Sequence, residues 1–282
     1  NRGWGFIPVA LPYYIPETSF GVGFSLLLYH RDDAAIQDNK PDEISLYGAY
    51  TFHNQLSLGI AADLYLHRID YRITGAVEFS RYPDKFWGIG PETPEEGDED
   101  FTSLITNIRG AFLTRIIDRL YVGPFYRFSY DYMEDREWGG LLRSGQVPGG
   151  DGTLMSGFGM EIAFDSRDSV FYPTRGIYAD LKGLVFRREL VNEYNFIKLE
   201  LDFRFFQQIW GDLVLAFQLV SELAGGTVPL QAMPRLGGDI MLRGYFQGRY
   251  RDENYLAFQT EVRFPVIWRF GGAVFCGIGQ VA

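Results

Sequence analysis

The sequence contains a single cysteine, three histidines and no long uninterrupted apolar segment. The lone Cys276 excludes a disulfide within the chain. We interpret it as a small apolar strand residue, because no histidine and orienting group are suggested that would activate its thiol. The best apolar stretch, 213–220, includes Gln218 and falls short of the roughly 18 residues that a membrane helix needs. The chain therefore does not read as a helical membrane protein.

Motifs for catalysis and metal binding are also missing. The three histidines, His30, His53 and His67, do not have the spacing of a metal site, and there is no G-x-S-x-G segment. Ser57 with His67 is the one pair that a barrel hydrolase could use, but nothing in the sequence supplies an activated nucleophile. We therefore expect no enzymatic activity, no cofactor and no metal.

The charge balance is acidic, with a net charge of -10. Nucleic-acid binding requires a basic surface, so we expect no such partner. The acidic residues concentrate in one loop: Glu92, Glu95, Glu96, Asp98, Glu99 and Asp100. This loop could bind calcium or join the divalent-ion layer of a lipopolysaccharide surface. It lacks the spacing of a defined calcium loop, so a solvated acidic loop is the preferred interpretation.

Aromatic residues are abundant, at 17% of the chain, and they favour strands and the membrane–water interface. Apolar and polar residues alternate along most of the sequence. In 197–205 the odd positions are Ile, Leu or Phe, and the even positions are Lys, Glu, Asp and Arg. This period of two predicts β-strands, and no segment sustains the 3.6-residue period of a helix.

The alternation predicts about thirteen strands in a single domain, 1–282. We expect them at 4–14, 19–31, 43–53, 56–67, 68–81, 101–116, 119–132, 153–166, 175–188, 193–208, 212–223, 254–265 and 269–281. Strands of a β-sandwich are shorter, at about five or six residues. A soluble barrel such as a lipocalin also alternates, but with its polar face outside. The number and length of the strands favour an antiparallel transmembrane β-barrel with a lipid-facing outside and a polar lumen.

The connections alternate in length, as they do in outer-membrane barrels. Long connections are expected at 82–100, 133–152 and 224–253. Tight ones are expected at 117–118, 209–211 and 266–268. The connection 32–42 is an exception, because it is long where a short one is expected.

Three segments carry motifs. The first is the turn 164–176, FDSRDSVFYPTRG; the second is the glycine-rich loop 236–252, which contains LRGY; the third is the strand 259–265, QTEVRFP. Their order and spacing resemble the barrel domain of the Omp85 superfamily, also called bacterial surface antigen. The opening segment 15–21, IPETSFG, also looks like the first hairpin of shorter members. The resemblance spans nearly the whole chain.

The resemblance implies a sixteen-strand barrel, of which this chain would hold the first thirteen. It also implies that the loop folds back into the lumen through Leu242, Arg243, Gly244 and Tyr245. In the family this arginine meets acidic residues on the next two strands. Glu261 stands at the first of these positions, whereas Gly277 stands where the second acid is usual. We therefore expect a lumen ion pair between Arg243 and Glu261.

The turn motif is expected to be architectural and to lie on the periplasmic side. Asp165, Arg167 and Asp168 would cap backbone amides and pair locally, while Pro173 and Gly176 would fix the entry and exit of the turn.

Function follows from the resemblance. It implies a barrel of the bacterial outer membrane that inserts or assembles outer-membrane proteins or translocates polypeptides. The expected partners are outer-membrane lipid, lipopolysaccharide and unfolded outer-membrane protein clients. The periplasmic POTRA repeats that are usual in the family do not occur in this chain. The alternative is a passive pore or structural surface barrel without assembly activity.

Overall fold

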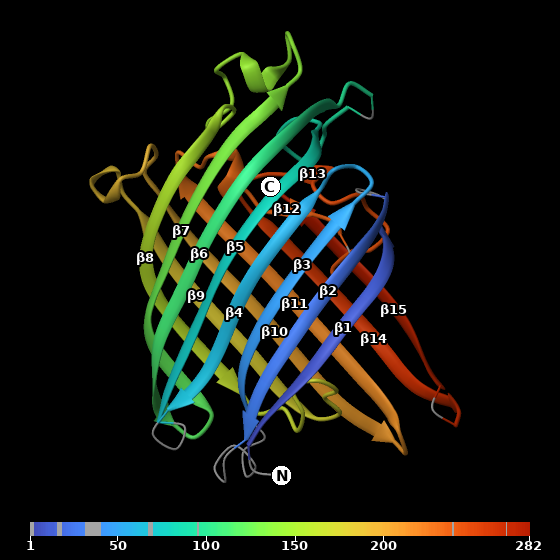
Figure 1. Cartoon of the computed structure of the whole chain (residues 1–282). Helices are drawn as coiled ribbons and strands as arrows, with labels where there is room; N and C mark the ends of the chain where they lie inside the picture. Colours follow the sequence, from blue (N-terminus) through green and yellow to red (C-terminus); the bar gives the residue numbers. More distant parts are fainter. Residues whose placement is uncertain are drawn as a thin grey trace.

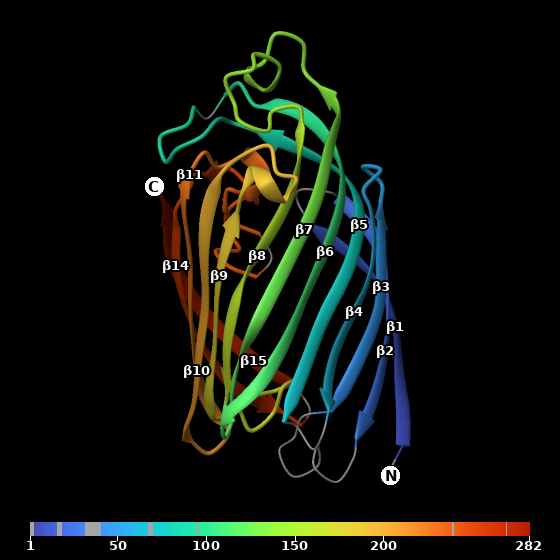
Figure 2. The same cartoon turned by 90° about the vertical axis from the view of Figure 1, so that its left-hand side faces the viewer.

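The structure, a computed structural model, describes residues 3–15, 19–31, 41–66, 70–94, 96–238, 240–268 and 270–282. These residues form a tall curved wall of long strands around a lumen (Figures 1 and 2). No helix in the described ranges is long and apolar enough to cross a membrane. The predicted all-β, antiparallel barrel architecture is confirmed.

Thirteen strands make up one sheet, in which each strand pairs antiparallel with the next and β11 pairs with β14. β1 and β15 are the two edges of this sheet. The strands are β1 (Gly3–Ile15), β2 (Ser19–Arg31), β3 (Asp42–Thr51), β4 (Leu56–Leu66), β5 (Tyr71–Phe86), β6 (Glu99–Ile117), β7 (Leu120–Arg136), β8 (Gly152–Asp165), β9 (Gly176–Phe186), β10 (Phe196–Trp210), β11 (Leu213–Gly226), β14 (Tyr255–Ile267) and β15 (Phe270–Val281).

Side chains alternate between the outer and inner surfaces of the wall. On β8 the outward Phe158 and Met160 are 56% and 51% exposed, whereas the inward Glu161 and Ala163 are buried. Large apolar side chains repeat on the outer surface of neighbouring strands, which is unfavourable in water but suits a hydrocarbon environment. The lipid-facing surface is therefore the outer one.

Charged side chains pair on the inner surface. Arg127 on β7 donates through its two terminal nitrogens to the carboxylate of Glu200 on β10, at 2.5 and 2.7 Å. Lys198 lies 3.2 Å from Glu200 and 2.6 Å from Glu222. Because β8 and β9 lie between β7 and β10, the Arg127–Glu200 pair bridges two strands across the concave side of the wall.

The two ends of the wall differ. The connections 87–98, 137–151, 187–195 and 227–254 gather at one end, which we call the loop end (Figure 1). The connections 118–119, 166–175 and 211–212 lie at the opposite end, which we call the turn end. The predicted alternation holds between the long loop-end connections 87–98, 137–151 and 227–254 and the tight turn-end connections 118–119 and 211–212, whereas the turn 166–175 is no shorter than the loop-end connection 187–195. The exceptional connection lies mostly outside the described residues, which omit 32–40.

Small elements within the connections were not predicted. They are β12 (Arg235–Leu236), β13 (Tyr250–Arg251) and the single 3₁₀ turns η1 (Leu141–Arg143), η2 (Arg188–Leu190) and η3 (Leu230–Ala232). The fifth strand, expected at 68–81, runs from Tyr71 to Phe86. Residues 67–69, where this strand was expected to begin, lie outside the described residues.

Candidate functional site

The connection between β11 and β14, residues 227–254, enters the lumen, and we call it the lumen loop. Its Val228, Leu230, Ala232 and Met233 are at most 6% exposed and belong to one apolar core. The wall contributes inward-facing side chains to this core, among them Phe101, Met133, Met155, Phe186 and Phe196. The lumen is therefore filled by the loop at this level, near the loop end.

Hydrogen bonds fix the lumen loop to two other loop-end connections. One is the β7–β8 connection and the other is the β5–β6 connection. The bonds join Leu230 N–H to the Pro148 carbonyl (2.9 Å), Gln231 Nε2 to the Gly149 carbonyl (2.8 Å), Gly90 N–H to the Arg251 carbonyl (2.9 Å), and Arg249 Nη2 to the carbonyls of Thr93 (3.0 Å) and Pro94 (2.9 Å). Other loop-end connections thus hold the loop near both of its ends.

Leu242, the first residue of the predicted motif, is the apolar anchor of the loop on the β14–β15 side. It is 7% exposed and packs in a small core with Ala257 and Val281. Its side chain lies over Gly277 and Gly279, where a Cβ would come within 3.1 and 2.7 Å of the leucine methyl groups. The backbone of Leu242 is left-handed, with φ 54°, a conformation that is uncommon for leucine. Gly277, at the position where the resemblance places an acid, instead provides room for this side chain.

The expected ion pair between Arg243 and Glu261 is not among the contacts of the described residues. Glu261 accepts a hydrogen bond from Arg263 Nε at 2.5 Å. Arg243 is exposed, and its guanidinium lies 4.5 Å from the centroid of the Phe275 ring. Phe275 pairs with Glu261 in the β14–β15 register, so the loop arginine reaches the expected region. Arg263 takes the carboxylate because it lies two residues along the same strand face.

The other two motif residues lie at the turn of the loop. Gly244 is exposed, and a Cβ added there would meet no atom within 4 Å. Tyr245 is 52% exposed and donates its backbone N–H to the Leu242 carbonyl at 3.0 Å. Its ring meets Tyr250 edge-on at 6.3 Å. The structure thus gives Leu242 the buried role and leaves the rest of the motif open to the lumen.

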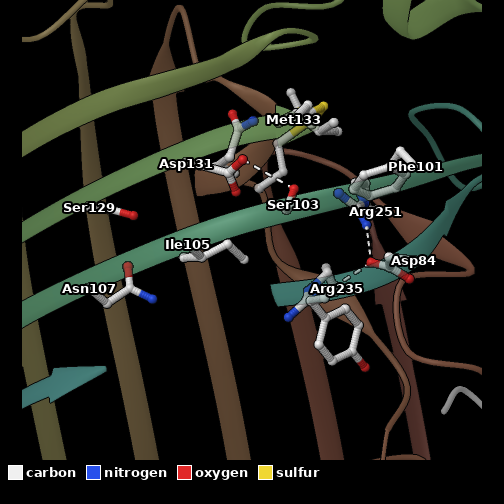
Figure 3. Close-up of a pocket in the computed structure, with 14 residues that line it drawn as sticks. Asp84, Phe101, Ser103, Ile105, Asn107, Ser129, Asp131, Met133, Arg235 and Arg251 are labelled. Carbon is white, nitrogen blue, oxygen red and sulfur yellow. Dashed lines mark hydrogen bonds and ion pairs between the residues drawn. The ribbon is translucent and has the colours of Figure 1, made fainter. Parts of the chain in front are cut away.

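Sequence reasoning missed a second cluster, at the stem of the loop. Arg235 on β12 and Arg251 on β13 are register partners, and both face Asp84 on β5 (Figure 3). Arg251 and Asp84 are almost fully buried, with side chains 5% and 4% exposed. Burial lowers the pKa of Arg251 to about 10, against the opposing effect of Asp84. The signal available in the sequence was the position of the two arginines, one just before the glycine-rich loop and the other near its end.

A polar pocket of about 160 Å³ lies beside these arginines (Figure 3). Ser103 and Asp131 line it from β6 and β7, and Ser103 Oγ lies 3.1 Å from Asp131 Oδ1. Arg251 Nε and Nη2 and Gln231 Oε1 are buried and have no hydrogen-bond partner. Polar atoms at the stem of the loop, on Arg251, and in η3, on Gln231, are therefore incompletely hydrogen-bonded.

The predicted turn motif closes on itself at the turn end. Asp168 accepts hydrogen bonds from the backbone N–H of Thr174 and Arg175, at 2.9 and 3.1 Å, and from Thr174 Oγ1 at 2.5 Å. Burial alone would raise the pKa of Asp168, but these hydrogen bonds outweigh it and hold the pKa below its ordinary value. The carboxylate thus acts as the cap that the sequence predicted.

Asp165 and Arg167 pair locally, as predicted, with Arg167 Nε and Nη2 at 2.9 and 2.8 Å from the carboxylate. Gly176 has φ 111°, and a Cβ there would lie 2.4 Å from the Ser166 carbonyl oxygen. Only glycine suits that position. Pro173 is buried, and its carbonyl accepts a hydrogen bond from Arg263 Nη1 at 3.5 Å. Arg263 thus connects the turn motif to the strand motif that carries Glu261.

The described residues hold no cluster of three or more His, Cys, Asp or Glu side chains that could bind a metal. In the acidic loop, Asp98 is bonded to Lys85, and Asp100 lies 3.2 Å from Lys85. The hydrogen bond from Lys85 holds the pKa of Asp98 below its usual value. Glu95 lies outside the described residues, as does His67 of the pair considered for hydrolysis.

Comparisons with known proteins agree with this geometry. The sequence model of the Omp85 superfamily domain matches residues 120–282. No match was found among curated proteins. The structure is similar to that of BamA from Haemophilus ducreyi lacking POTRA domains 1-3, with a TM-score of 0.63 and 10% identity over 99% of this chain and 57% of that one. It is also similar to CdiB from Acinetobacter baumannii, with a TM-score of 0.53 and 13% identity over 97% of this chain and 49% of that one. The chain spans about half the length of these structures, and the likeness concerns the fold.

Proposed function

Because the chain belongs to the Omp85 superfamily, we propose that it forms the barrel of a protein that inserts outer-membrane proteins or moves polypeptides across the bacterial outer membrane. The observation that carries this proposal is the lumen loop, which packs an apolar core inside the barrel. A passive pore functions through an open, water-filled lumen, whereas a lumen occupied by a loop suits a protein whose interior opens under control.

In this proposal the apolar outer surface contacts outer-membrane lipid. The loop end faces outward, toward lipopolysaccharide, and the acidic loop is solvated there. The turn end faces the periplasm, and the motif around Asp168 is architectural. Clients are unfolded outer-membrane proteins or translocated polypeptides, and no nucleic acid is involved, in keeping with the net charge of -10.

Leu242 is proposed to hold the loop in its working position. It is the buried member of the motif and lies on β14 and β15, the two strands that follow the loop. Truncating it should loosen the loop while leaving the strand pairing of the wall in place.

Reconstitution tests the proposal. The native full-length protein is placed in liposomes, a urea-denatured outer-membrane barrel is added, and client folding is followed by heat-modifiability on gels. We expect faster folding than in empty liposomes and reduced activity for Leu242→Ala. The lipid-facing Leu199→Ala, 43% exposed in the structure, serves as the matched control and should retain activity.

The same liposomes, fused to a planar bilayer, test the passive-pore alternative. Steady conductance without any acceleration of client folding or polypeptide transport would establish a passive pore and overturn the proposal.

A further inference from the structure

The stem of the lumen loop brings two positive charges face to face. Arg235 and Arg251 are register partners in the β12–β13 pair, so their side chains leave the same side of this short ribbon. Like charges directly opposite each other destabilise a strand pair. The ribbon therefore needs a negative charge between the two guanidinium groups.

Asp84 on β5 supplies that charge from the wall. Its Oδ2 lies 3.4 Å from Arg235 Nη1 and 3.5 Å from Arg251 Nη2, so a single oxygen serves both arginines (Figure 3). Its Oδ1 accepts the backbone N–H of Lys85 at 2.8 Å, which orients the carboxylate. The acid is 4% exposed and therefore weakly screened by solvent.

The compensation is incomplete. Both contacts are long for charge-assisted hydrogen bonds, and Arg251 Nε and Nη2 have no hydrogen-bond partner. Beside them the polar pocket leaves space into which the stem can shift. An ion cluster of this kind still holds the loop in place. Because its hydrogen bonding is incomplete, the free-energy difference between the closed and the released loop is smaller than it would be for a fully hydrogen-bonded cluster.

We propose that Asp84 is the positioning residue of the lumen loop: its charge offsets the repulsion between Arg235 and Arg251 and so holds the stem against the wall. When both arginines are present, losing that charge releases the loop and opens the lumen. This inference rests on the proposed function only in treating the loop as a movable part. The contact between Asp84 and Arg235 joins residues 151 positions apart, so it links the early wall to the late loop.

The experiment measures single-channel conductance of the full-length protein in planar bilayers, without clients. The wild type should be mostly closed, and Asp84→Asn should raise the occupancy of the open state roughly tenfold, equivalent to about 1.4 kcal/mol. Asp84→Glu keeps the charge and should stay closed. The matched control is Asp63→Asn, which breaks a different lumen ion pair, Asp63–Arg72, away from the loop.

A second variant separates release of the loop from damage to the fold. In Asp84→Asn with Arg235→Met, one of the two facing charges is also removed, so the conductance should return toward that of the wild type. Equal openings in Asp84→Asn and the wild type, or in Asp84→Asn and Asp63→Asn, would overturn the proposal. The proposal would also be overturned if neither Asp84→Asn nor the double variant folds, because Asp84 would then be required for the folding of the wall.

Should Asp84→Asn alone fail to fold, a folded and closed double variant supports the proposal. A folded double variant that stays open overturns it. Because no client is present, these outcomes are independent of whether the protein inserts barrels.

Discussion

The lumen loop and the turn at 166–175 are both motif segments, yet they are held in different ways. The turn is closed by its own side chains, with Asp168 capping Thr174 and Arg175 a few residues away. The lumen loop is held by residues far along the chain, such as Thr93 for Arg249. A segment held locally carries its interactions in its own sequence. A segment held at a distance takes its position from the wall around it.

The largest loss of unfolding free energy is expected at Gly176, where the backbone of the turn leaves no space for a side chain. In Gly176→Ala the new Cβ would meet the backbone of Ser166 and Arg167 in a left-handed conformation. We expect a loss of about 3 kcal/mol in unfolding free energy, measured by urea unfolding in detergent micelles. Gly225→Ala is the control, because nothing lies within 4 Å of its Cβ. Equal midpoints for the two variants would show that the turn can reshape itself.

In the lumen loop, the corresponding tightly packed position is the contact of the Leu242 side chain with Gly277 and Gly279. A Cβ in Gly279→Ala would come within 2.7 Å of Leu242 Cδ1, and we expect about 2 kcal/mol of destabilisation by the same unfolding measurement. Adding Leu242→Ala should recover part of that loss, because the clash disappears. Gly183→Ala, whose Cβ would make an ordinary 3.9 Å contact, is the control. If the losses of unfolding free energy in the two single variants simply add in the double variant, Leu242 does not clash with the new side chain at position 279.

Acid should weaken the turn before it weakens the apolar core of the loop. The pKa of Asp168 is lower in the folded turn than in the unfolded chain. Its contribution is therefore complete above the unfolded value of about 4 and is lost as the pH falls through the lower folded value. Asp168→Ala should cost about 1 kcal/mol at neutral pH and remove this pH dependence. Proteolysis of the turn across a pH series measures it, with Asp212→Ala, in another turn-end connection, as the control.

The smallest effect concerns Arg243. A double-mutant cycle of Arg243→Ala with Phe275→Leu should give a coupling of about 0.5–1 kcal/mol, typical of a cation–π contact at an exposed site. A cycle with Glu261→Gln should give a coupling near zero. A coupling of about 3 kcal/mol with Glu261 would instead restore the ion pair that the sequence suggested.

Most of the wall could be predicted from the alternation of apolar and polar residues, because successive residues of a strand face its outer and inner surfaces in turn. The strand expected at 193–208 appears at Phe196–Trp210, and the one expected at 254–265 appears at Tyr255–Ile267. The strands β12 and β13 are too short to show any period. They form only because the loop is confined within the wall, so their pairing could not be inferred locally.

The site, too, could be predicted only where its interactions are local in the sequence. The residues of the turn lie close in sequence, and their pairing followed from their chemistry. Arg243 had several possible partners in the lumen, and the choice depends on the competition that Arg263 wins for Glu261. The roles of Asp84 and Gly279 depend on three-dimensional proximity that no local pattern records.

The long sequence separations in the lumen loop also set an order of events. Arg249 bonds to Thr93 and Pro94, 156 and 155 positions earlier, and Leu242 packs on β15, which is later in the chain. Contacts between distant residues form slowly, because a large chain loop must close before they can form. The lumen loop can therefore settle only after both the early and the late strands are in place. We expect its docking to follow the pairing of these strands, so that a barrel stalled during biogenesis would carry an unprotected loop inside a wall whose strands are already paired.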